Sequence, residues 1–159
     1  MTRPVALDPV TPIAQPTVGD DMTEGRRRLL PPFPAVSLSD LRRWAVSWMD
    51  QHPTFGVDPD YVVLSMNELV TNSIRHGSGP VDVALAENSR HLRLGVSDGS
   101  DDLPLQPAAG INAEGGRGMV VVDRLTTRWG VHRLHGGGKT VWCEFAAERR
   151  PQTDVRATA

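Results

Sequence analysis

A carboxylate and a carboxamide, Glu68 and Asn72, stand four residues apart in the stretch from Ser65 to Gly77. On a helix, that spacing stacks the two side chains on one face. The amide oxygen is a suitable ligand for Mg²⁺, and the carboxylate is a suitable general base. A solvated polar face is the competing interpretation, and residues further along the chain have to decide between the two.

A helix starting at Pro59 must position this pair. Asp58 is a good N-cap, and proline suits the first helical position. Gly77 ends the helix. Apolar residues recur between these ends at spacings of three, four and seven, which commits one face to the core; they are Val62, Val63, Met66, Leu69, Val70 and Ile74.

The remaining elements follow from changes in the apolar period. We expect a short edge strand, a helix beginning at Ser37 or Ser39, two strands, a short helix and two further strands; their ranges are 26–33, 37–50, 81–85, 92–96, 119–127, 129–134 and 140–145. Residues 100–118 have no period and form a long loop, and residues 100–115 of it are expected to be a mobile lid. This order predicts an α+β fold: a two-layer α/β sandwich with helices on one face of a mixed, mainly antiparallel sheet.

Three further stations could carry chemistry. Asp98-Gly99 starts the long loop, Gly115-Gly116-Arg117-Gly118 ends it, and Gly138-Lys139-Thr140 opens the last strand. Alone, Asp98-Gly99 would be an ordinary turn. The third station is no P-loop, because Arg133 stands where that motif needs glycine and a strand follows instead of a helix.

Taken in order, the four stations resemble the ATP-binding domain of the gyrase, heat-shock chaperone, histidine kinase and MutL superfamily, the Bergerat fold. The small anti-sigma factor serine/threonine kinases are the most similar members. The matching segments are an N-box, two glycine boxes and a closing strand; they are Asn67 to Gly77, Val96 to Ser100, Gly116 to Met119, and Gly138 to Trp142. The resemblance covers about residues 26 to 146. Asp101 departs from it, standing where the first box usually has a second glycine, and with Asp102 it adds negative charge near the loop.

The resemblance implies a role for each polar station. Asn72 would hold Mg²⁺ together with phosphate oxygens, and Glu68 would accept the proton of the attacking nucleophile. Asp98 would accept a hydrogen bond from the exocyclic amine of adenine. Thr140 would support that contact from the facing strand.

The glycine-rich station and the end of the helix complete the implied nucleotide site. Backbone N–H groups of Gly116, Arg117 and Gly118 would approach phosphate at a helix N-terminus. Ser73, Arg75, His76 and Met119 belong to the same nucleotide-binding set. For His76, a favourable contact with the helix C-terminus stays an open alternative.

The implied function is that of an ATP-binding regulatory protein, a kinase that transfers the γ-phosphate to a serine or threonine of an antagonist protein. The alternative is a non-catalytic, ATP-liganded module that sequesters a sigma factor or another regulatory partner. The implied cofactors are ATP and Mg²⁺, and the implied partners are a sigma factor, an anti-anti-sigma antagonist protein, or both. Homodimerisation stays open. No second domain is recognisable, so topoisomerase, chaperone and sensor-kinase roles fit poorly.

Composition is consistent with these expectations. The chain is 39% hydrophobic and 23% charged, as in ordinary globular proteins. A net charge of -2 gives no electrostatic argument for nucleic acid or membrane as the partner. The single cysteine, Cys143, excludes a disulfide framework and a thiolate metal site. No run reaches the roughly 18 apolar residues of a spanning helix, so a cytoplasmic protein is expected.

The two ends of the chain are predicted to lie outside the domain. Residues 1–24 carry Pro4, Pro9, Pro12 and Pro16 without any apolar period, which indicates a disordered tail. Residues 25–147 would then form the ATP-binding domain, and residues 148–159 a flexible C-terminal tail.

Overall fold

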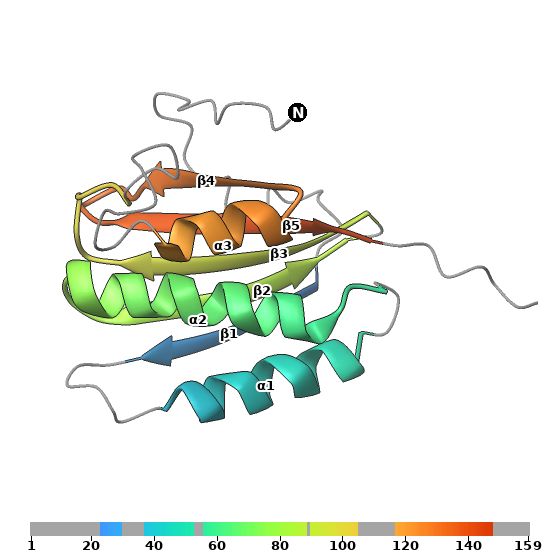
Figure 1. The fold of residues 1–159 in the computed structure, drawn as a ribbon. Coiled ribbons are helices and arrows are strands. Elements are labelled where there is room, and N and C mark those ends of the chain that lie inside the picture. Colours follow the sequence, from blue (N-terminus) through green and yellow to red (C-terminus); the bar gives the residue numbers. More distant parts are fainter. Residues whose placement is uncertain (1–22, 30–36, 53–55, 89, 105–116, 148–159) are drawn as a thin grey trace, which may run out of the picture.

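The computed structural model describes residues 23–29, 37–52, 56–88, 90–104 and 117–147 (Figure 1). Most of the two predicted tails, and most of the expected lid, therefore lie outside the described residues. Thr23 and Glu24 were assigned to the N-terminal tail, but they belong to the first strand, β1 (Thr23–Leu29). Because β2 continues to Glu87, Thr23 has a partner there, which extends the edge strand toward the N-terminus.

Helix α1 (Leu38–Asp50) begins at Ser37, the first of the two predicted N-caps. The Ser37 side chain accepts a hydrogen bond from the Asp40 N–H, and the Asp40 carboxylate accepts one from the Ser37 N–H. This capping box satisfies two backbone donors that the helix leaves free. The hydrogen bonds from Ser37 also lower the pKa of Asp40 to about 2.

Helix α2 (Pro59–His76) runs between the predicted ends. Asp58 accepts a hydrogen bond from the Asp60 N–H at 2.9 Å, and Pro59 occupies the start of the helix. Gly77 closes the helix with a bond from its N–H to the Ser73 carbonyl. Ile74 was expected on the apolar face but is 39% exposed, because the neighbouring Ser73 takes the buried position. The third helix, α3 (Arg117–Leu125), starts two residues before its predicted beginning.

The strands of the described chain form one sheet in the order β1-β2-β3-β5-β4. The other four strands are β2 (Val81–Glu87), β3 (His91–Asp98), β4 (Arg128–Arg133) and β5 (Lys139–Ala146). All pairings between these described strands are antiparallel, so the parallel part of the expected mixed sheet is absent among them. The cause is the connectivity: β2–β3 and β4–β5 are hairpins, and the central strands β3 and β5 also pair antiparallel.

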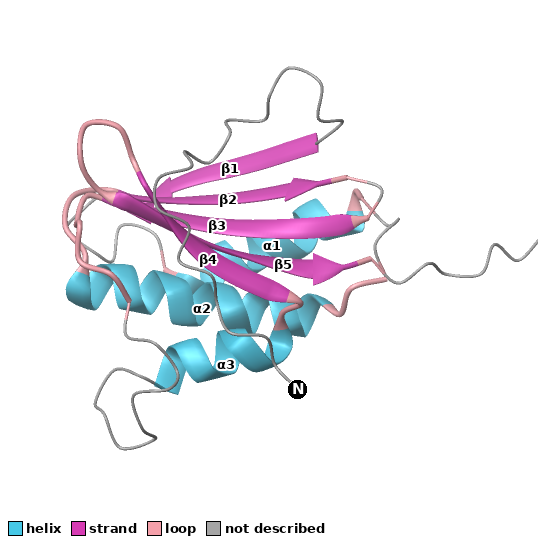
Figure 2. Ribbon diagram, turned by 90° about the horizontal axis from the view of Figure 1, so that it is seen from above, coloured by secondary structure: helices cyan, strands magenta, loops and turns pink. Residues whose placement is uncertain are grey.

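The helices cover one face of the sheet, as the α+β sandwich requires (Figure 2). Strict alternation along β3 directs every second side chain to this face. The core lies between the two layers. Its fully buried members include Leu41, Val62, Met66, Val70, Val83, Leu85, Leu92, Leu94, Val96, Met119, Val122 and Cys143.

The opposite face of the sheet carries a charged cluster around Trp142. Glu144 is 2% exposed and accepts hydrogen bonds from Arg93 and Arg128, and both guanidinium groups lie near the Trp142 ring. Burial alone would raise the pKa of Glu144, but the hydrogen bonds from Arg128 and Arg93, with their charges, hold that pKa below its ordinary value. The carboxylate therefore stays ionised at neutral pH.

Candidate functional site

A cavity of about 290 Å³ lies where the C-terminal half of α2, the start of α3, the end of β3 and the start of β5 meet. Its lining consists of Leu69, Asn72, Ser73, His76, Asp98, Asp102, Leu103, Pro104, Met119, Lys139 and Val141. Five of these were expected at a nucleotide site from the sequence: Asn72, Ser73, His76, Asp98 and Met119. The cavity thus brings together residues as far apart along the chain as Leu69 of α2 and Val141 of β5.

Asp98 is the deepest polar group of the cavity. It is 3% exposed and ends β3. Its Oδ1 accepts hydrogen bonds from the Ser100 N–H and from the Lys139 ammonium group, each at 2.9 Å. Its Oδ2 is buried and has no hydrogen-bond partner among the described residues. A buried carboxylate oxygen without a donor is costly, and at a cavity wall a ligand can supply the missing donor.

Lys139 was not expected at the site, and it takes the position that Thr140 was expected to fill. In the sheet, Asp98 pairs with Lys139 and Ser97 pairs with Thr140. Because neighbouring residues of a strand point to opposite faces, Thr140 points away from Asp98. Its hydroxyl lies 2.7 Å from that of Ser97. The expectation that Thr140 supports Asp98 is therefore corrected: Lys139 does so, directly and through an ion pair.

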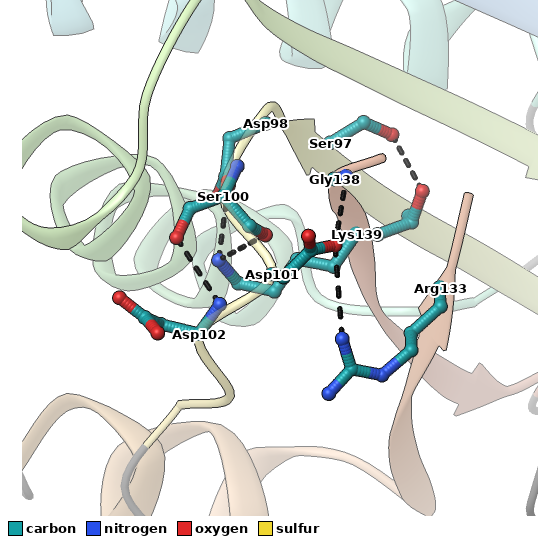
Figure 3. Close-up of polar contacts among 9 residues, drawn as sticks. Ser97, Asp98, Ser100, Asp101, Asp102, Arg133, Gly138 and Lys139 are labelled. Carbon is teal, nitrogen blue, oxygen red and sulfur yellow. Dashed lines mark hydrogen bonds and ion pairs between the residues drawn. The ribbon is translucent and has the colours of Figure 1, made fainter. Parts of the chain in front are cut away.

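Asp101, the departure from the first glycine box, ties the loop after β3 to the β4–β5 turn. Its Oδ1 accepts a hydrogen bond from the Gly138 N–H at 3.0 Å and lies 3.7 Å from the Arg133 guanidinium (Figure 3). Its charge is therefore compensated by a neighbouring cation. The same loop is held a second time, because the Lys139 ammonium group lies 3.3 Å from the Ser100 carbonyl.

Glu68 and Asn72 both face the first turn of α3. A Cβ atom added at Gly118 would lie 2.6 Å from Oε2 of Glu68 and 3.5 Å from Nδ2 of Asn72. Glycine at this position therefore permits the close approach of α3 to α2. The half-buried Glu68 carboxylate sits at a helix N-terminus, where the helix dipole favours negative charge. Asn72 lines the cavity and Glu68 does not.

The other expected site residues are placed as follows. Arg75 and Arg117 are exposed, and neither lines the cavity. Gly116 and residues 105–115 of the expected lid lie outside the described residues, whereas Asp102, Leu103 and Pro104 of the same loop line the cavity. In the described part of the chain, no group of three or more His, Cys, Asp or Glu side chains could hold a metal. A metal site made of protein carboxylates is therefore not found there.

The helices of the described residues have no membrane-spanning character. None of these helices combines the length and the apolarity that crossing a membrane requires.

The sequence did not predict Lys139 as a site residue, because a lysine beside a threonine at the start of a strand does not indicate which of the two faces the helices. Only the register of β5 against β3 resolves this.

The chain was compared with known proteins. A family model for the histidine kinase-like ATPase domain matches residues 30–145, which includes both elements that carry Glu68, Asn72 and Asp98. The uncharacterized protein SCO4941 of Streptomyces coelicolor is 40% identical to this chain over 99 residues, which is 59% of this chain and 92% of that protein. The family match fits the α+β sandwich and the cavity described above. The chain belongs to the family of histidine kinase-like ATPase domains.

Proposed function

We propose that this chain is an ATP-binding regulatory protein that acts as an anti-sigma factor serine/threonine kinase. Its acceptor would be a serine or threonine hydroxyl of an antagonist protein, and its regulated partner a sigma factor. The family places the chain among ATP-utilising, kinase-type domains. The four ordered sequence stations support the narrower assignment.

One observation carries the proposal: Asp98 lines the cavity, and its buried Oδ2 has no hydrogen-bond partner among the described residues. A buried acceptor of this kind needs a donor, and the exocyclic amine of adenine is one. A base that presents a carbonyl oxygen at that point would leave two acceptors facing each other, which costs binding free energy. The residues present therefore fit an adenine nucleotide.

Asn72 supplies the side chain that fits the accompanying Mg²⁺. The ion prefers oxygen ligands and keeps much of its coordination from water and substrate phosphates. Asn72 lines the cavity and would contribute its carboxamide oxygen, while nucleotide phosphates and water would supply the remaining ligands. Bound Mg-ATP would supply a transferable γ-phosphoryl group with its charge neutralised.

Glu68 would take the proton that the acceptor hydroxyl gives up during transfer. It lies one helical turn before Asn72 on the same face of α2, so the base and the metal ligand are held by one rigid element. Its carboxylate is half-buried and therefore reachable by a protein substrate.

A second function is favoured by a different feature of Glu68. Its carboxylate already lies against the first turn of α3, so it can serve as a structural anchor for that helix. In that case the chain would bind ATP as a structural ligand and sequester its protein partner without phosphorylating it. Homodimerisation would be compatible with either function.

The binding part is tested by titration calorimetry of the full chain with Mg-ATP and Mg-GTP. We expect ATP to bind and GTP to bind much more weakly. Asp98→Asn should weaken ATP binding by about 1–3 kcal/mol, because the amide can present a donor to the amine. Equal affinities for ATP and GTP would remove Asp98 from base recognition.

The catalytic part is tested by transfer from radiolabelled ATP to a protein co-purified with the chain. Asn72→Ala should lose both Mg-ATP binding and transfer. Glu68→Gln should keep binding, while transfer falls by about 10²–10⁴-fold, as for a lost general base. A wild-type chain that holds its partner and ATP but transfers no phosphate would establish the sequestering function instead.

A further inference from the structure

Lys139 is the single lysine of the chain, in which every other basic residue apart from histidine is arginine. It is also 5% exposed, which is unusual because lysine is among the residues least often buried. Taking an ammonium group out of water is costly unless nearby groups compensate. A buried lysine at this position therefore calls for a specific structural or functional role.

The ammonium group has two partners, one at the end of β3 and one in the loop that follows it. It donates to Oδ1 of Asp98 at 2.9 Å and lies 3.3 Å from the Ser100 carbonyl oxygen (Figure 3). An ammonium group carries three donors, so these contacts leave one N–H without a partner among the described residues. Lys139 also lines the cavity.

The ion pair leaves half of the Asp98 carboxylate free. An arginine would present a planar fork that typically binds both oxygens of a carboxylate at once. The lysine ammonium is a compact charge and engages only Oδ1, while Oδ2 remains without a donor. Asp98 and Lys139, which both line the cavity, therefore hold an unpaired acceptor and an ammonium donor next to each other.

We propose that Lys139 is a second base-reading residue of the nucleotide cavity. Its remaining N–H donates to the ring nitrogen N1 of adenine, next to the exocyclic amine that Asp98 accepts. This inference rests on the proposed function and extends it from one recognising residue to two. Adenine presents a donor and an acceptor side by side on this edge, which complements the acceptor of Asp98 and the donor of Lys139.

Hydrogen bonds of the neighbouring residues hold Asp98 and Lys139 in place. Gly138, which precedes Lys139, donates its N–H to Asp101 at 3.0 Å. Ser100, which accepts from Lys139, also donates its N–H to Oδ1 of Asp98. Donor and acceptor are thus held by one local network. Guanine presents the reverse order, an acceptor at position 6 and a donor at N1, and would place an acceptor against each acceptor and a donor against each donor.

The decisive comparison uses the wild-type chain and two analogues. The analogue 1-deaza-ATP replaces N1 by a C–H group and keeps the amine, whereas purine riboside triphosphate keeps N1 and lacks the amine. We expect titration calorimetry to show about tenfold or greater weakening for 1-deaza-ATP, as for a lost hydrogen bond to a charged group. Binding of ATP and 1-deaza-ATP within twofold of each other would overturn the role of Lys139 while leaving ATP binding intact.

Because there is only one lysine, a spectroscopic readout is available that a purely structural ion pair would not move. In protein labelled with ¹⁵N-lysine, the single side-chain Nζ resonance reports on Lys139 alone. ATP and purine riboside triphosphate should both shift it, and 1-deaza-ATP should shift it much less. Equal shifts with ATP and 1-deaza-ATP would contradict the contact.

Variants separate this inference from the proposed function. Lys139→Met keeps the aliphatic stem and removes the donors, so the preference for ATP over 1-deaza-ATP should fall to about one. Lys139→Arg keeps the charge but can engage both oxygens of Asp98, so ATP binding should still weaken about tenfold or more. A preference that persists in Lys139→Met would overturn the inference. If either variant fails to fold by circular dichroism, the wild-type comparison still decides. A wild-type chain that binds none of the three nucleotides would overturn the proposed function itself.

Discussion

The β4–β5 turn offers a test of how tightly the cavity wall is built. Gly136, Gly137 and Gly138 have φ values of 91°, 101° and 93°. These values are in the left-handed region, which side chains other than glycine rarely adopt. A Cβ atom at Gly136 or Gly137 would meet nothing within 4 Å. At Gly138 it would fall inside van der Waals contact with the Asp98 carbonyl oxygen and lie 3.0 Å from the Cα atom of Gly99.

The substitution Gly138→Ala should therefore destabilise the fold far more than alanine at Gly136 or Gly137. At all three positions alanine pays roughly 1–2 kcal/mol for the backbone conformation. At Gly138 the overlap is with main-chain atoms of another strand end, which cannot rotate away, and overpacking of this kind adds about 1–3 kcal/mol. We expect a loss of about 2–5 kcal/mol in the free energy of unfolding, a large share of the roughly 5–15 kcal/mol of a typical domain.

Urea and thermal denaturation followed by circular dichroism would measure this loss. Gly137→Ala is the matched control, because it carries the conformational strain without the overlap. A domain of this size loses roughly 3–6 °C in Tm per kcal/mol, so the two variants should be well separated. Gly138→Ala should also weaken ATP binding, since it displaces the residue next to Lys139, whereas Gly137→Ala should not. Equal stabilities of the two variants would refute the steric argument.

Two further predictions concern carboxylates. Glu144→Gln should lower the free energy of unfolding by about 1–2 kcal/mol at neutral pH, less than for a fully buried ion pair, because the Arg93 and Arg128 side chains are partly exposed. Because the pKa of Glu144 is lowered in the folded state, the ionised carboxylate stabilises the fold at pH values above its ordinary pKa of 4.5, and this stabilisation is lost as the pH falls through the pKa of the folded state. The urea midpoints of variant and wild type should therefore converge in acid, and a constant difference between them from pH 7 to pH 3 would contradict this. Gly118→Ala should push the Glu68 carboxylate away from the first turn of α3, so phosphoryl transfer at saturating ATP should fall in a radiolabel assay; unchanged transfer would separate Glu68 from catalysis.

Local signals in the sequence predicted the elements that carry most of the site. The N-cap at Asp58, the proline after it and the apolar period predicted α2, and with it the common face of Glu68 and Asn72. Alternation predicted β3 and placed Asp98 at its end. Each of these signals is contained within one element, so no knowledge of tertiary packing was needed.

The parts that escaped prediction depend on how elements meet. Whether Lys139 or Thr140 faces Asp98 is decided by the register of β5, and a shift of one residue would exchange them. The bond from the Gly138 N–H to Asp101 ties the start of β5 to the loop after β3 and so supports this register. From the sequence, Asp101 could be interpreted only as an unfavourable negative charge, because its hydrogen-bond and ion-pair partners lie more than thirty positions further along the chain.

The two carboxylate oxygens of Asp98 have different roles in this site. Oδ1 holds the fold, since it binds the Ser100 N–H and the Lys139 ammonium group. Oδ2 has no hydrogen-bond partner among the described residues and is a desolvated acceptor in a residue that lines the cavity. Leaving an acceptor unpaired destabilises the free protein, and a ligand that donates to it recovers that free energy on binding. An adenine nucleotide should therefore stabilise the chain by more than its contacts with Asn72 and with the phosphate-binding residues provide. In thermal shift measurements, Asp98→Asn should lose that additional stabilisation. An equal rise in Tm with saturating ATP for wild type and Asp98→Asn would show that Oδ2 takes no part in binding.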